Sequence, residues 1–66
     1  MEAILDSSFI ISCMRRNIDF MAELEALGFV AVIPREVLQE LKDLRFGKTS
    51  RETRLIADLA LEVLNG

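Results

Sequence analysis

Two short apolar runs stand out in the pattern of hydrophobic and polar positions. Ala3-Ile4-Leu5 is followed by the polar triplet Asp6-Ser7-Ser8, and the β-branched run at residues 29–33 ends at Pro34. Uninterrupted apolar runs with such boundaries are typical of strands that are buried on both faces. We therefore predict strands at residues 3–5 and 29–33.

The segment between these runs has the periodicity of two helices. We expect a short helix at residues 9–14, with Ser7 or Ser8 as its cap. A second helix is expected to begin after Asp19 and to end at Gly28, a residue suited to a left-handed helix end. Its apolar residues lie at positions i, i+1, i+4 and i+7, on one face of a helix: Phe20, Met21, Leu24 and Leu27.

The same spacing returns after the second run, which indicates two further helices. Pro34 suits the first position of a helix that ends at Gly47, and Thr49 with Glu52 fits a capping box for the last helix. The predicted order is β-α-α-β-α-α, an α/β chain whose two strands pair in parallel. Such a sheet needs cover on both faces and both edges. We expect residues 1–66 to be the N-terminal portion of a single, incomplete three-layer domain.

Composition adds the expectation of a partner. The chain has 66 residues, of which 52% are hydrophobic, and a single cysteine, Cys13, that we expect in the core. A domain of this size buries only about 60% of its unfolded surface, so the surplus apolar surface favours self-association or a missing C-terminal half. One cysteine and the absence of an export or membrane segment indicate a reduced, cytoplasmic protein.

Charge is spread unevenly along the chain. Residues 1–44 carry eight acids and four bases, whereas residues 45–66 carry four bases and three acids, within a net charge of −3. Lys48, Arg51 and Arg54 could contact RNA phosphates, although a solvated face with an Arg54–Asp58 ion pair is the alternative. Arg15 and Arg16 are the other RNA-binding candidates.

Asp6 and Glu40 are the residues with the clearest chemistry. Asp6 follows the first strand, at the edge where open parallel sheets bind ligands, and Glu40 flanks the apolar stripe of the helix after the second strand. Both can reach one crevice, and two nearby carboxylates favour a shared Mg²⁺ or Mn²⁺. A helix-capping Asp6 and a solvated Glu40 are the alternatives.

These segments resemble the PIN-domain ribonucleases. The stretch from Ala3 to Ile10 is similar to that family's opening strand with its first acid, and Val30 to Leu41 is similar to its strand-Pro-x-x-Val-x-x-Glu-Leu motif. Asn17 to Phe20 and Gly47 to Glu52 look most like the archaeal and eukaryotic branch that processes ribosomal RNA. The toxin branch of toxin–antitoxin pairs is the nearest rival.

The resemblance implies a metal-dependent endoribonuclease that cleaves single-stranded or looped RNA. Asp6 and Glu40 would be its first two catalytic, metal-binding carboxylates, and Ser8 a hydroxyl that orients them. The family has two further acids beyond the equivalent of residue 66, so we expect this chain alone to be inactive. A non-catalytic PIN-like binding or assembly module is the competing hypothesis. A dinucleotide-binding domain is excluded because no glycine-rich loop follows the first strand, and nothing indicates a preference for DNA.

Overall fold

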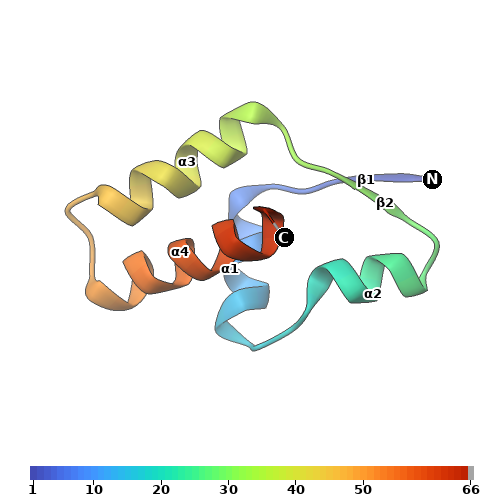
Figure 1. The fold of residues 1–66 in the computed structure, drawn as a ribbon, viewed down its shortest axis with the longest axis horizontal. Helices are drawn as coiled ribbons and strands as arrows, with labels where there is room; N and C mark the ends of the chain where they lie inside the picture. The colour runs from blue at the N-terminus through green and yellow to red at the C-terminus, as the bar shows by residue number, and fades with distance from the viewer. Residues whose placement is uncertain (66) are drawn as a thin grey trace.

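The computed structural model describes residues 1–65 and has the predicted order of strands and helices (Figure 1). The described part of the chain is elongated, with extents of 37 × 23 × 19 Å. Its elements are β1 (Glu2–Ile4), α1 (Ser7–Arg15), α2 (Phe20–Ala26), β2 (Val30–Val32), α3 (Arg35–Phe46) and α4 (Arg51–Asn65). The α/β prediction is therefore confirmed, with both strands shorter or shifted by one or two residues.

β1 and β2 form a two-stranded parallel sheet in which Ala3 pairs with Ala31. Alternate residues of a strand point to opposite faces. Ala3 and Ala31 face the hydrophobic core, whereas Ile4 on the opposite face is 76% exposed and Val30 is 62% exposed. One face of the sheet is therefore largely exposed within residues 1–65, with Val32 half-buried.

The caps of α1 and α4 are not the residues that the sequence predicted. α1 begins at Ser7, because Asp6 rather than Ser7 or Ser8 is its N-cap, with its Oδ1 accepting from the backbone N–H of Phe9 at 2.7 Å. α4 begins at Arg51, so the prediction of Thr49 as its cap is wrong. Ser50 takes that position, and its Oγ accepts from the backbone N–H of Thr53 at 3.1 Å. Serine caps a helix at least as well as threonine.

α1 and α2 end in the same way, with a residue in the left-handed conformation. Asn17 has φ +60° and Gly28 has φ +80°. In both turns the N–H of this residue bonds back to the helix, as does that of the following residue, so that carbonyls of the last turn are satisfied. The prediction of Gly28 as a helix end is confirmed. Pro34 lies at the N-cap of α3, one position before the predicted one.

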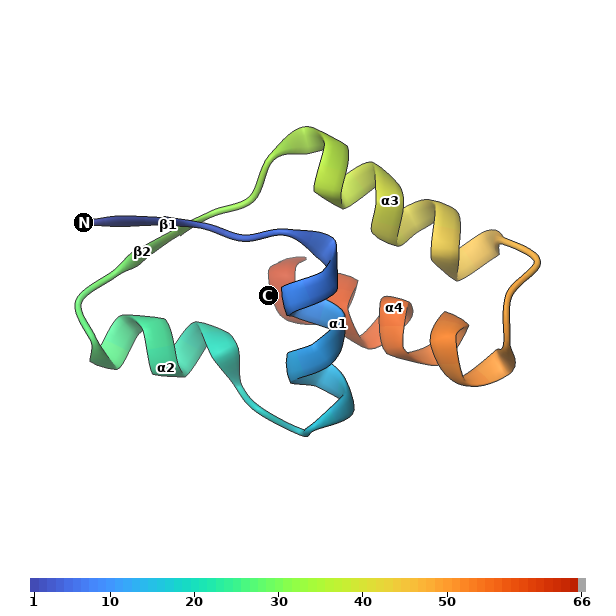
Figure 2. The ribbon, with the colours of Figure 1, turned by 180° about the vertical axis from the view of Figure 1, so that it is seen from behind.

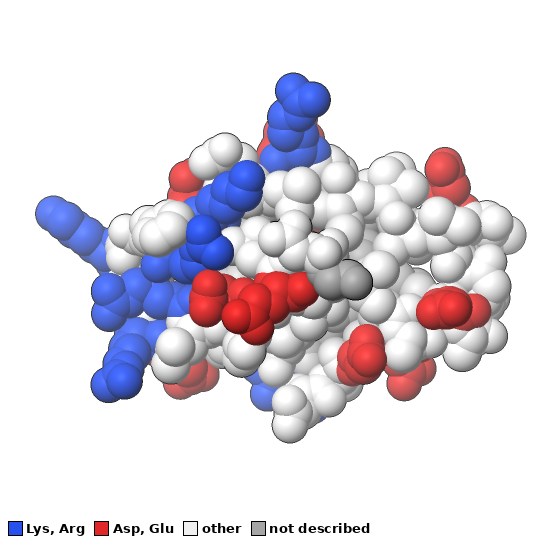
Figure 3. Space-filling model, viewed as in Figure 1, with Lys and Arg blue, Asp and Glu red and all other residues white. Residues whose placement is uncertain are grey.

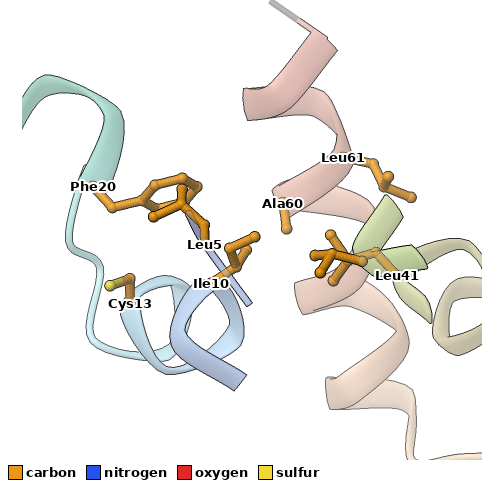
Figure 4. Packing of buried hydrophobic residues seen from close by; sticks show 8 residues of the cluster. Leu5, Ile10, Cys13, Phe20, Leu41, Ala60 and Leu61 are labelled. Atoms are coloured by element: carbon orange, nitrogen blue, oxygen red, sulfur yellow. The ribbon is translucent and has the colours of Figure 1, made fainter. Parts of the chain in front are cut away.

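The core joins the two halves of the described chain. Leu5, Ile10 and Phe20 meet on one side, and Leu41 with Ala60 approaches from α3 and α4 (Figure 4). Figure 2 shows α1 lying against α4. α3 packs antiparallel to α4, and the two form a helical hairpin. Cys13 is a buried free thiol in this cluster, as predicted.

The expected surplus of apolar surface is present. The large hydrophobic side chains that remain exposed include Met1, Ile4, Phe9, Ile18, Leu27, Val30, Phe46, Leu55, Leu59 and Val63. No helix within residues 1–65 has the length and apolar character needed to cross a membrane.

Candidate functional site

Asp6 lies where β1 passes into α1, and it has a structural role there. One carboxylate oxygen, Oδ1, caps the helix through the N–H of Phe9, and a negative charge at this end is favoured by the helix dipole. The other oxygen, Oδ2, has no hydrogen-bond partner among residues 1–65, and the side chain is exposed. The capping alternative is therefore confirmed, and one oxygen remains available for a cation.

Glu40 reaches the same end of α1 from the second turn of α3. Its Oε2 accepts a hydrogen bond from the hydroxyl of Ser7 at 2.9 Å. Ser7 follows Asp6 directly, so the contact brings the second predicted carboxylate to the residue beside the first, across 33 positions of sequence. This hydrogen bond is the tertiary contact that joins the two predicted acids into one region.

The hydroxyl that contacts Glu40 belongs to Ser7, whereas Ser8 is the residue to which the resemblance gives an orienting role. The cause is the earlier start of α1. Successive helical residues point about 100° apart, and with Ser7 as the first helical residue its hydroxyl faces α3. Ser8 is exposed and makes no hydrogen bond through its side chain among residues 1–65.

The carboxylate oxygens of Asp6 and Glu40 are of the type that binds a hard divalent cation, but they are few. Mg²⁺ and Mn²⁺ prefer carboxylate oxygens, of which each acid offers one without a partner in the described chain. Within residues 1–65 no three His, Cys, Asp or Glu side chains are grouped to hold a metal. The described residues would therefore offer a cation at most two carboxylate ligands here, one from Asp6 and one from Glu40.

The predicted RNA-binding residues lie in two places. Arg15 ends α1, and its Nη2 donates to the Thr53 hydroxyl of α4 at 3.4 Å, while its neighbour Arg16 is the exposed C-cap of α1. Lys48 and Arg51 are both exposed at the connection between α3 and α4. The structure thus adds a contact for Arg15 and leaves the other four exposed: Arg16, Lys48, Arg51 and Arg54.

The ion pair expected between Arg54 and Asp58 is not the one that forms. Asp58 Oδ1 instead pairs with Arg45 Nη1 at 3.4 Å, because α3 and α4 pack side by side and bring these residues together. The Arg45 guanidinium also lies over the ring of Phe46, 4.4 Å from its centroid.

The sequence analysis gave no role at these sites to three residues: Ser7, Arg45 and Phe46. Phe46 could have been found on a helical wheel, where it falls about 180° from Val37 and so faces away from the apolar stripe. The partner of Ser7 had no such signal, since it depends on how α1 packs against α3.

We compared the chain with protein-family models, curated proteins and solved structures, and none of them matches it.

Proposed function

We propose that this chain is part of a metal-dependent endoribonuclease of the PIN type, with Asp6 and Glu40 as two of its metal-binding carboxylates. The hydrogen bond between Ser7 and Glu40 supports the proposal most strongly, because it draws the second acid to the residue next to the first. The substrate suggested by the resemblance is single-stranded or looped RNA. The setting it suggests is ribosomal RNA processing, and the single cysteine favours a reduced, cytoplasmic location.

Each residue has a separate task in this proposal. Asp6 holds one oxygen on the helix end and offers the other to a cation, which fixes the direction of that second oxygen. Ser7 holds Glu40 through Oε2, and Oε1, which has no partner among residues 1–65, would bind the same cation. A bound Mg²⁺ or Mn²⁺ would supply an activated water and stabilise charge on the phosphodiester.

Two carboxylates do not fill the six positions that Mg²⁺ prefers. Further acids from another chain segment or from a second copy would complete a catalytic centre. An isolated copy is therefore expected to cleave RNA weakly or not at all. The exposed sheet face with Ile4 and Val30 offers surface for such an association.

The experiment combines metal binding with RNA cleavage. Paramagnetic Mn²⁺ is added to the isotope-labelled protein, and broadening of backbone NMR signals is expected first around residues 6–8 and 40. Asp6→Asn and Glu40→Gln should each remove this broadening and any Mn²⁺-dependent cleavage of a single-stranded RNA. Asparagine caps helices as well as aspartate, so Asp6→Asn separates metal binding from capping.

A matched control exists in Asp19, which caps α2 by accepting from the N–H of Ala22 at 3.1 Å. Asp19→Asn makes the same chemical change at a second exposed helix cap and should leave both readouts unaltered. Broadening that is centred elsewhere, or that survives Asp6→Asn and Glu40→Gln, contradicts the proposal.

A non-catalytic binding or assembly module is the second candidate. It is favoured by the capping role of Asp6, which accounts for that residue without a metal, and by the largely exposed apolar face of the sheet. Under this alternative Mn²⁺ causes no broadening centred on residues 6–8 and 40. Light scattering would then show self-association that is lost when Ile4 and Val30 are both replaced by Thr.

A further inference from the structure

The end of the molecule where α3 turns into α4 carries a surface that the metal proposal does not use. An open hollow of about 460 Å³ lies there. We call this surface the Phe46 platform, and it is lined by Arg45, Phe46, Arg51, Arg54, Leu55 and Asp58.

An aromatic ring dominates the platform. Phe46 is 78% exposed, although burial of an aromatic side chain is normally a large gain. The guanidinium of Arg45 stacks on this ring and is itself held by Asp58, which fixes a cation against the aromatic system. A planar ring with a cation beside it is the arrangement on which nucleobases stack.

Further cations lie at the same end of the molecule. Arg51 and Arg54 are exposed in the first turn of α4, and Lys48 is exposed in the turn before it. Figure 3 shows lysine and arginine side chains gathered at this end of the molecule. Asp58 is the single acid of the lining, and its charge is engaged by Arg45. The platform is thus a local basic surface on a chain whose net charge is −3.

We propose that the Phe46 platform binds single-stranded nucleic acid, with one base stacked on Phe46 and backbone phosphates contacted by Arg51 and Arg54. This inference goes beyond the proposed function, since it requires neither a metal nor Asp6 and Glu40. An acidic peptide would satisfy the cations but has no flat π-face for the exposed ring, which favours a nucleic acid as the occupant.

Fluorescence anisotropy with a labelled twelve-nucleotide oligouridylate, in EDTA and at low salt, tests the proposal. Phe46→Ala should weaken binding by about 5- to 160-fold, since stacking contributes about 1–3 kcal/mol per base. Phe46→Leu keeps an apolar side chain without a π-face and should weaken binding nearly as much. Arg51→Gln and Arg54→Gln should each lower the slope of log Kd against log salt by about 0.7.

Arg35→Gln is the matched control, because it removes an exposed arginine at the opposite end of α3. It should leave the salt slope unchanged. Circular dichroism checks that each variant is folded. The replaced side chains are exposed, so the fold should be retained. Wild-type affinity in Phe46→Leu overturns the proposal. Equal displacement by an oligoglutamate of the same charge overturns it as well, because the surface would then be a general polyanion site.

Discussion

The acidic region at the start of α1 and the Phe46 platform share helix α3 but are built differently. Glu40 lies in the second turn of α3 and Phe46 at its end, about 9 Å further along the axis at roughly 1.5 Å per residue. The acidic region is joined by one hydrogen bond between residues 33 positions apart. The platform is made by residues 45–58, which are close in sequence.

The acidic region and the Phe46 platform therefore depend on different contacts. Glu40 reaches Ser7, the neighbour of Asp6, only if α1 docks on α3 through the core, whereas the platform requires only the hairpin of α3 and α4. Variants can therefore disturb one region and spare the other, with Mn²⁺ affinity reporting on the acids and oligouridylate affinity reporting on the platform.

The largest effect is expected from Ile10→Ala. Ile10 is fully buried on α1, and truncation of such a residue costs about 2–5 kcal/mol of unfolding free energy. Urea denaturation should show this loss, and Mn²⁺ affinity should fall more than oligouridylate affinity because α1 carries Asp6 and Ser7. Leu59→Ala on the exposed side of α4 is the control and should cost far less. Equal stability of the two variants would contradict the packing described for α1.

Gly47→Ala should disturb the platform alone. A Cβ at this residue would lie 2.6 Å from the carbonyl oxygen of Asp43, so the turn after α3 must shift, at a cost of about 1–3 kcal/mol. Oligouridylate affinity should fall while Mn²⁺ affinity is retained in the folded protein.

Gly28→Ala is the counterpart to this variant. Its φ of +80° makes alanine unfavourable by about 1–2 kcal/mol, yet open space surrounds the added Cβ. Thermal unfolding should reveal the loss, and neither affinity should change. A Gly47→Ala protein that binds oligouridylate as wild type does would show that the platform does not depend on this turn.

The smallest effect on stability is expected from Ser7→Ala. It removes the hydroxyl that holds Glu40 and should cost about 0.5–1.5 kcal/mol at most, since the hydrogen bond is exposed. Calorimetric titration should nevertheless show weaker Mn²⁺ binding, because Glu40 loses its fixed position. Ser8→Ala should leave Mn²⁺ affinity unchanged. Weaker Mn²⁺ binding in Ser8→Ala, with unchanged binding in Ser7→Ala, would instead support the orienting role that the resemblance gives to Ser8.

Local patterns in the sequence were sufficient for the order of elements and the helix end at Gly28. Apolar periodicity and turn residues act within a few positions, so they can be recognised without tertiary information. Helix starts were less well predicted at Asp6 and Ser50, because neighbouring Asp, Ser and Thr residues compete for one cap position. The Ser7–Glu40 and Arg45–Asp58 contacts were beyond reach, since both depend on how whole helices pack.

The central claim, that Asp6 and Glu40 bind one divalent cation, is tested most directly by a double-mutant cycle in Mn²⁺ affinity. Wild type, Asp6→Asn, Glu40→Gln and the double variant are titrated with Mn²⁺ and followed by electron paramagnetic resonance. If both carboxylates hold the same ion, each single change removes most of the binding and the double change adds little, so the effects are strongly non-additive. Additive effects, or wild-type affinity in either single variant, would contradict a shared site.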